Sequence, residues 1–324
     1  MKVISIVVPV FNEQDNIQIF YQEVRRNMET AGYPFELIFI DDGSSDRTVI
    51  LLDKLTQQDP RVKALVLARN FGHQIALTCG LDYAQGDAVI TMDGDMQHPP
   101  DLLPSMIRKW EEGYEVVQTV RVDTEGVSWF KKSSSSLFYR LINAMSAVHI
   151  IEGGSDFRLL DRKAVNTFQR FKEKARFIRG IIGDMGYRQA QIEFVAHERF
   201  AGTSKFSLRK MVSFALNGIT AYSTLPLRFA FYLGLFLGLI SFFLTLDVVY
   251  IKLFTTEAVP GWATIAASVL MLGGLQLAGI GIIGEYIGRI FEEVKQRPLY
   301  WVREELRSKD QLLPQKEKRT STAC

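Results

Sequence analysis

The sequence predicts an α/β fold with a mostly parallel sheet, followed by an amphipathic segment and two apolar helices. The first half alternates short β-branched runs with segments of helical spacing, which is typical of parallel strands joined by crossover helices. The last third contains two uncharged apolar runs, 229–246 and 261–284. Each run is long enough to cross a hydrocarbon core, which takes about 20 helical residues. A pair of buried helices in a soluble domain is the alternative for these runs.

The elements of the first half follow in order from hydrophobic periodicity. Strands are expected at 3–8, 35–40, 62–67, 88–92 and 115–120, and helices at 15–29, 47–57, 74–84 and 99–112. In the first helix, for example, Ile17, Phe20 and Val24 recur on one face. A long amphipathic helix is expected at 129–145, a turn at 153–158 and an edge strand at 187–195.

Right-handed crossovers bring the carboxyl ends of the first four strands to one edge of the sheet. The loops after these strands are 9–13, 41–46, 69–73 and 93–97, and each contains polar or acidic residues. Such convergence is the usual setting of a ligand site in an open α/β sheet. The sequence therefore predicts a binding site at this edge.

Asp93 and Asp95 follow the fourth strand and are separated by one glycine. Two carboxylates at that spacing can hold one hard cation, Mg²⁺ or Mn²⁺, which is commonly shared with substrate phosphates. An Asp-Gly turn that caps the next helix is the alternative. The convergence of polar loops favours the metal site. No Gly-x-Gly-x-x-Gly turn and no Gly-x-x-x-x-Gly-Lys-Ser/Thr loop is present, so dinucleotide and P-loop sites are not expected.

Composition excludes several other classes. The 324 residues have a formal net charge of +2, which argues against nucleic acid as a partner. The two cysteines, Cys79 and Cys324, are far apart, so a disulfide framework is not expected. The four histidines show no zinc spacing. Met1 and Lys2 lead directly into a strand pattern, so no signal peptide is expected.

Charge predicts how the apolar runs would be oriented. Lys and Arg cluster before the first run and after the second, whereas the link between them has only Lys252. The positive-inside rule then places both chain ends and the first half in the cytoplasm. Residues 206–228 form a basic amphipathic segment that is expected at the bilayer interface, with an ordinary domain helix as the alternative. Glycine pairs in the runs, such as Gly234 with Gly238, suit close helix packing and association into a homo-oligomer.

Several motifs together give the chain a resemblance to a known family. They are Val7-Val8-Pro9-Val10-Phe11-Asn12-Glu13, Asp41-Asp42-Gly43-Ser44, Arg69-Asn70-Phe71-Gly72, Asp93-Gly94-Asp95-Met96-Gln97, Gly154-Ser155-Asp156-Phe157-Arg158-Leu159, Gly202-Thr203-Ser204-Lys205-Phe206, Gly284-Glu285-Tyr286-Ile287-Gly288-Arg289 and Arg297-Pro298. With them the sequence resembles the family 2 glycosyltransferases of the Rossmann-like GT-A fold. Within that family it resembles the polyisoprenyl-phosphate glycosyltransferases, relatives of dolichol-phosphate mannose synthase and of the bactoprenol glucosyltransferases. Many of these relatives have alanine or aspartate where Gly94 stands.

The resemblance implies a role for each matching residue. Nucleotide binding is implied for Pro9, Phe11, Glu13, Asp41 and Asp42; metal and diphosphate binding for Asp93, Asp95 and Gln97; a catalytic role for Asp93, Asp95 and Asp156; and acceptor-phosphate binding for Arg121, Lys131, Ser135, Arg199 and Lys205. It also implies a multi-pass protein of the bacterial inner membrane. The domains would be a cytoplasmic catalytic domain at 1–205, the juxtamembrane segment at 206–228, a two-helix hairpin at 229–288 and a cytoplasmic tail at 289–324.

The implied reaction is the inverting transfer of one sugar from a nucleotide-sugar to polyprenyl phosphate. Such an acceptor is largely dianionic at neutral pH, because its second pKa is near 6, so it needs positioning more than a base. Asp156 could be a base or a positioning group. UDP-glucose is the expected donor, while N-acetylglucosamine, galactose and mannose stay open as sugars. A protein or diacylglycerol acceptor, or a non-catalytic membrane assembly subunit, are the alternative functions.

Overall fold

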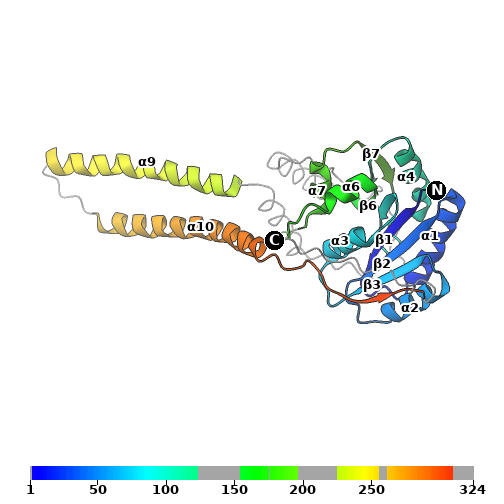
Figure 1. The fold of residues 1–324 in the computed structure, drawn as a ribbon. Helices are drawn as coiled ribbons and strands as arrows, with labels where there is room; N and C mark the ends of the chain where they lie inside the picture. Colours follow the sequence, from blue (N-terminus) through cyan, green and yellow to red (C-terminus); the bar gives the residue numbers. More distant parts are fainter. Residues whose placement is uncertain (1, 123–153, 175, 196–224, 255–260, 309–324) are drawn as a thin grey trace, which may run out of the picture. The chain divides into compact units, whose positions relative to one another are not determined.

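The computed structural model describes residues 2–122, 154–174, 176–195, 225–254 and 261–308 (Figure 1). The chain divides into two compact units. The first unit comprises 1–140, 148–205 and 298–324, and the second comprises 141–147 and 206–297. The predicted helix at 129–145, the segment 206–224 and most of the link between the apolar runs lie outside the described residues.

The first unit contains one sheet with helices on both faces. Its strands are β1 (Ile4–Val10), β2 (Phe35–Asp41), β3 (Val62–Leu67), β4 (Ala88–Thr91), β5 (Val116–Arg121), β6 (Gly154–Asp161), β7 (Gln189–Phe194) and β8 (Val302–Leu306). Its helices are α1 (Ile17–Ala31), α2 (Thr48–Gln58), α3 (His73–Tyr83), the 3₁₀ turn η1 (Pro100–Leu102), α4 (Leu103–Glu111), α6 (Arg162–Phe168) and α7 (Ile178–Asp184). The α/β fold predicted from the alternating pattern is therefore confirmed.

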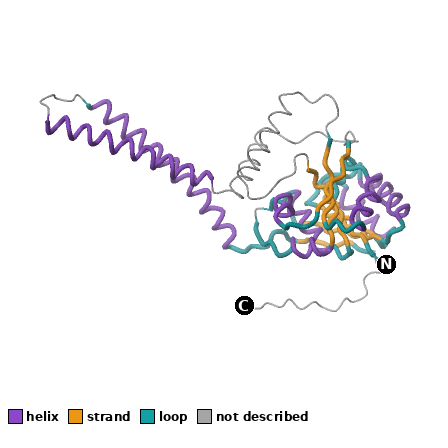
Figure 2. Tube along the Cα trace, turned by 90° about the horizontal axis from the view of Figure 1, so that it is seen from above, coloured by secondary structure: helices purple, strands orange, loops and turns teal. Residues whose placement is uncertain are grey.

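The strand order is β7-β5-β6-β4-β1-β2-β3-β8. The pairs of β1 with β2, β1 with β4, β2 with β3 and β5 with β7 are parallel, while β6 and β8 are antiparallel to their neighbours. Figure 2 shows the strands in orange at the centre of this unit, with helices around them. The predicted edge position of β7 is confirmed.

Two cores cover the two faces of the sheet. On β1, Ile6 and Val8 face a core that includes side chains from α1, α2 and α4. Val7 between them faces the other core, which includes side chains from α3, α6 and α7. All seven residues of β1 are buried. A strand that is covered on both faces reads as a continuous apolar run, and this is why β-branched runs in the sequence marked the central strands.

Pro9 is tolerated inside β1 because of where pairing ends. The last pair between β1 and β4 joins Val7 to Thr91, and Met92 N donates to the Val7 carbonyl oxygen at 3.1 Å. Pro9, two residues beyond Val7, faces the same side, where β4 no longer runs alongside. Its missing N–H therefore costs no ladder hydrogen bond.

The turn predicted at 153–158 is wrong, because this segment begins β6. Gly154 and Ser155 are favoured turn residues, but β6 runs antiparallel between β4 and β5. Phe157 and Leu159 face one core and Leu160 faces the other, so the strand is held by burial on both faces. Local composition suggested a turn, whereas tertiary burial selects the strand.

The chain returns to the sheet after the apolar segment. No element was expected within 289–324, yet β8 pairs antiparallel with β3 and forms one edge of the sheet. Ala68 N donates to the Trp301 carbonyl oxygen at 2.9 Å, and Tyr300 Oη donates to Asp82 on α3 at 2.9 Å. The sheet therefore receives strands from both sides of the apolar segment in the sequence.

The second unit contains the long helices α9 (Leu225–Phe254) and α10 (Trp262–Val294), which lie side by side (Figures 1 and 2). Many large apolar side chains on them are exposed, such as Phe231 and Leu277. Within the described residues, Met271–Val294 is the one segment long and apolar enough to span a membrane, and Phe229–Ile240 is a shorter apolar helix. Two spans therefore stay a prediction. A Cβ added to any described glycine of α9 or α10 would meet no atom within 4 Å. Among the described residues, these glycines therefore make no close contact between the two helices.

Candidate active site

Polar side chains from several strands meet at one edge of the sheet. β1, β2 and β4 end there, whereas β6 runs the other way and begins there. In the ladder of β4 and β6, Thr91 pairs with Arg158. Two residues further along the same register, Asp93 comes opposite Asp156. Strand pairing thus brings together two carboxylates that are far apart in the sequence.

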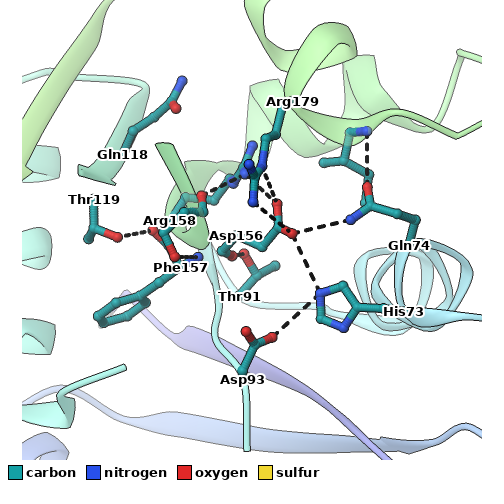
Figure 3. A network of polar contacts seen from close by, with 12 residues as sticks. His73, Gln74, Thr91, Asp93, Gln118, Thr119, Asp156, Phe157, Arg158 and Arg179 are labelled. Carbon is teal, nitrogen blue, oxygen red and sulfur yellow. Dashed lines mark hydrogen bonds and ion pairs between the residues drawn. The ribbon is translucent and has the colours of Figure 1, made fainter. Parts of the chain in front are cut away.

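Asp156 accepts hydrogen bonds from side chains on several elements (Figure 3). Arg158 Nη2 donates to Oδ1 at 2.7 Å, and Arg179 Nε on α7 donates to the same oxygen at 3.2 Å. Gln74 Nε2 on α3 donates to Oδ2 at 3.2 Å, and His73 Nε2 lies 3.6 Å from that oxygen. Both carboxylate oxygens are therefore engaged.

These neighbours stabilise the ionised form of Asp156. Burial works against the charge, but Arg179 and His73 outweigh burial and hold the pKa of Asp156 well below its usual value. Arg158 acts in the same direction. A carboxylate in this state takes up a proton poorly at neutral pH, which makes it a weak general base. The geometry instead favours Asp156 as an anchor for cationic side chains.

Arg158 is a fully buried guanidinium. Its Nη2 also donates to the Ser155 carbonyl oxygen at 2.7 Å. Nε and Nη1 are buried and have no hydrogen-bond partner among the described residues. Burial lowers the pKa of Arg158 to about 10, and the group is still charged at neutral pH. Two guanidinium groups, of Arg158 and Arg179, thus share the one carboxylate of Asp156.

His73 connects Asp156 with the loop after β4. It is the first residue of α3, and its Nε2 lies 3.4 Å from Asp93 Oδ1 as well as 3.6 Å from Asp156 Oδ2. Burial disfavours the imidazolium, but Asp93 and Asp156 outweigh burial and raise the pKa of His73 to about 9. At neutral pH the ring is therefore a cation between two carboxylates.

His98 holds the backbone of Asp93. Asp93 N donates to His98 Nδ1 at 2.9 Å, so we assign the ring proton to Nε2. That nitrogen contacts Ser155 Oγ at 2.8 Å and lies 3.6 Å from Asp93 Oδ2. The ring stacks on Phe157 with centroids 5.2 Å apart. These contacts fix the start of the loop after β4 against β6.

The rest of this loop packs against β1. A Cβ on Gly94 would lie 2.9 Å from Val10 Cγ1, so the close approach favours glycine. Met96 adopts a left-handed backbone conformation with φ 64°. Gln97 N donates to Asp95 Oδ1 at 3.2 Å, which closes the turn between these two residues.

The acidic residues of this loop fit a divalent cation that a substrate helps to hold. In the part of the chain that the structure describes, no three His, Cys, Asp or Glu side chains could hold a metal ion by themselves. Mg²⁺ commonly takes only one or two carboxylates together with substrate phosphates. Asp93 Oδ1 has no hydrogen-bond partner among the described residues, with His73 Nε2 3.4 Å away, and a carboxylate oxygen is a usual ligand of such a cation. Asp93, Asp95 and Gln97 are the residues that would hold such an ion.

The loops after β1 and β2 are bound to each other. Asn12 N donates to Ser44 Oγ at 2.8 Å, and Ser45 N donates to Asn12 Oδ1 at 2.9 Å. Glu13 N donates to Thr48 Oγ1 at 2.9 Å. The segment that contains Phe11 and Glu13 is therefore fixed relative to the end of β2.

Asp41 and Asp42 are buried at the end of β2. The two oxygens of Asp42 accept the backbone N–H groups of Phe71 at 2.7 Å and Gly72 at 2.9 Å, which fixes the start of α3. Asp41 Oδ2 accepts the backbone N–H of Ser44 at 3.1 Å. Burial raises the pKa of both carboxyl groups. Both aspartates hold loops, and their contact with a nucleotide stays a prediction.

The structure brings part of the predicted set together. Asp93, Asp95, Gln97 and Asp156 lie at the edge described above, and Arg121 ends β5 at the same edge with an exposed side chain. Lys131, Ser135, Arg199 and Lys205 lie outside the described residues. Their role toward the acceptor, like those of the other site residues, stays a prediction.

No role was predicted for five side chains of this group, those of His73, Gln74, His98, Arg158 and Arg179. A role for His73 could have been predicted, because it ends the polar loop 69–73 at the predicted edge. The roles of the other four could not, because they depend on strand β6 and helix α7, which the sequence did not predict.

An α/β fold with acidic loops at the carboxyl edge of its sheet is typical of enzymes that bind their ligand at that edge. Residues 5–168 match the model of Glycosyl transferase family 2, and the chain belongs to this family. Glycosyltransferase YkcC of Bacillus subtilis is 45% identical over 92% of this chain and 92% of its own. The SfII prophage-derived bactoprenol glucosyl transferase of Shigella flexneri is 43% identical over 93% of this chain and 97% of its own. A glycosyltransferase of Synechocystis is 40% identical, over 92% of this chain and 94% of its own.

Proposed function

We propose that this protein transfers a single glucose from UDP-glucose to the phosphate of a polyprenyl phosphate, with inversion, at the cytoplasmic face of a bacterial inner membrane. The observation that carries the proposal is the pair Asp93 and Asp95 in one packed loop, with a buried Asp93 oxygen suited to a cation. The choice of sugar and acceptor rests on similarity to bactoprenol glucosyl transferases across 93% of this chain.

The chemistry needs charge stabilisation and positioning more than proton removal. The acceptor phosphate is already largely dianionic at neutral pH, so it can attack the anomeric carbon without a base. A bound Mg²⁺ or Mn²⁺ would neutralise the departing nucleoside diphosphate as a Lewis acid. The engaged state of Asp156 agrees with a reaction that has no general base. His98 and Gly94 keep the Asp93 loop in place for binding.

The apolar unit supports a membrane-bound acceptor. Exposed residues such as Phe229, Phe243 and Leu277 would be costly in water, and a lipid phase removes that cost. The strands on either side of the apolar helices in sequence, β7 and β8, both belong to one sheet. An apolar hairpin that crosses the bilayer twice would satisfy this connection, since both of its ends then lie on one face.

Transfer of label into lipid tests the proposal directly. The full chain in detergent is given UDP-[¹⁴C]glucose, undecaprenyl phosphate and Mg²⁺ or Mn²⁺, and the solvent-extractable product is counted. Asp95→Ala is expected to lower the rate at least about 10²-fold by removing a charge that holds the diphosphate and its ion. Asp53→Ala, an exposed aspartate on α2, is the matched control and should keep the rate. Label that stays water-soluble, or full activity in Asp95→Ala, would contradict the proposal.

A panel of donors tests the finer choice of sugar. UDP-N-acetylglucosamine, UDP-galactose and GDP-mannose are compared with UDP-glucose under the same conditions. We expect UDP-glucose to have the highest kcat/KM. A higher value for another donor would replace glucose in the proposal and leave the acceptor unchanged.

A further inference from the structure

The three charged side chains around Asp156 differ in how much of each is exposed to solvent. Arg158 is 1% exposed and Asp156 is 12% exposed, so both lie beneath the surface. Arg179 is 31% exposed and His73 is 42% exposed, so both reach it. Figure 3 shows Arg179 and His73 on different sides of the Asp156 carboxylate. The Asp156 carboxylate therefore contacts two donors that solvent can reach, Arg179 and His73.

Two guanidinium groups share the carboxylate of Asp156, and the second carboxylate nearby, that of Asp93, lies 3.4 Å from His73 Nε2. Arg158 lies 2.7 Å from Asp156 and forms an ion pair with that carboxylate. Arg179 adds a second guanidinium to the same oxygen at 3.2 Å. Two buried nitrogens of Arg158 are also without a partner among the described residues. The guanidinium of Arg179, which is only partly covered, makes this part of the edge suited to bind an anion.

We propose that Arg179 and His73 bind a phosphate group of a substrate, and that Asp156 is a positioning residue that holds both donors. This inference rests on the proposed function. A guanidinium offers a planar fork that matches phosphate oxygens, and imidazole adds a further N–H. His73 Nε2 is 3.4 Å from Asp93 Oδ1, so the bound phosphate lies beside the loop that would hold the cation.

Two phosphates of the reaction have the required chemistry. One is the diphosphate of the sugar donor, whose charge grows as the sugar leaves, and the other is the phosphate monoester of the acceptor. Fixed donors aimed at either group stabilise it without reorganisation during the reaction. Separate binding measurements distinguish these two sources.

The test uses the full chain in detergent with Arg179→Gln, Arg179→Lys and His73→Asn, and with Arg170→Gln as an exposed control. Calorimetry gives the Kd of UDP and of uridine in Mg²⁺, and the transfer assay gives KM for undecaprenyl phosphate. We expect Arg179→Gln and His73→Asn to weaken one phosphate-bearing substrate at least 10-fold with uridine affinity unchanged, and to lower Tm less than Asp156→Asn does. A raised Kd of UDP identifies the donor diphosphate, and a raised KM for undecaprenyl phosphate identifies the acceptor. Arg179→Lys should lose less affinity, since lysine keeps the positive charge but lacks the planar guanidinium.

Two results would overturn this inference while the proposed function stands. In the first, wild type transfers glucose to lipid and the Arg179 and His73 variants match Arg170→Gln in both constants. In the second, the variants lose uridine affinity as much as UDP affinity, which indicates a general structural role. A wild-type protein that transfers no sugar to lipid would instead overturn the proposed function itself.

Discussion

Asp42 and Asp156 are two carboxylates at the same edge of the sheet, one buried and one 12% exposed, and they are satisfied in opposite ways. Asp42 accepts two neutral backbone N–H groups, from Phe71 and Gly72. Asp156 accepts side-chain donors, and two of these are the guanidinium groups of Arg158 and Arg179. Burial raises the pKa of Asp42, whereas the cations around Asp156 outweigh burial and lower its pKa.

The difference separates a structural carboxylate from one in a charged site. Backbone amides fix the path of a loop, and the surrounding charge stays negative. Guanidinium groups carry full charges, and the partly exposed one of Arg179 can also bind an anion. Near β1 and β2 the carboxylate of Asp42 therefore holds a loop in place, whereas near β4 and β6 the carboxylate of Asp156 pairs with charged side chains.

The largest effect is expected when the charge of Asp156 is removed. In Asp156→Asn the buried Arg158 loses its counter-ion, and breaking a buried ion pair in this way costs about 3–5 kcal/mol. Thermal unfolding of the full chain should show a clear fall in Tm, with transfer activity reduced at temperatures where the variant is still folded. An unchanged Tm would mean that Asp156 does not hold the arginines.

A smaller effect is expected for Asp42→Asn. The amide oxygen can still accept one of the two N–H groups, so the loss should be about 1–3 kcal/mol. Its Tm should lie between those of wild type and Asp156→Asn. If Asp42→Asn were the more damaging change, the contrast between the two carboxylates would be wrong.

Asp59 is a carboxylate away from this edge that forms an ion pair with Arg61. Burial opposes its charge, but Arg61 outweighs burial, with a contribution from Tyr21, and lowers the pKa of Asp59 to about 2. A lowered folded-state pKa stabilises the protein above the unfolded value of 3.8, and this stabilisation is lost as pH falls toward 2. Asp59→Asn should therefore cost about 2 kcal/mol at pH 7 and progressively less below pH 4. A pH-independent difference in unfolding free energy between wild type and variant would contradict the ion pair.

The smallest effect is expected for Gly94→Ala in the loop that would bind the metal. The new methyl group would lie 2.9 Å from Cγ1 of the buried Val10, so the loop or this strand must move slightly, at a cost of about 1 kcal/mol. Transfer activity should stay within several-fold of wild type, while Mg²⁺ dependence measured in the same assay shifts little. A complete loss of activity would show that the glycine backbone itself, beyond its small size, is needed for binding.

Local pattern predicted much of the first unit but failed at particular strands. The runs at β1, β2, β3 and β4 were found because these strands are buried on both faces almost throughout, so their sequence is mostly apolar. β6 was missed because Gly154 and Ser155 look like a turn when taken alone. β8 was missed because only two of its residues are apolar, and pairing with β3 is what makes it a strand.

The α/β class, the parallel strands and the acidic loop of Asp93 and Asp95 could be predicted, since they depend on periodicity and on residues close together in the chain. Which side chains share a site depends instead on the folded arrangement. Asp156 reaches Asp93 through antiparallel pairing of β6 with β4, and Arg179 reaches Asp156 from α7. Such contacts join residues far apart in the sequence, and their stability comes from long-range burial and charge that no local pattern records.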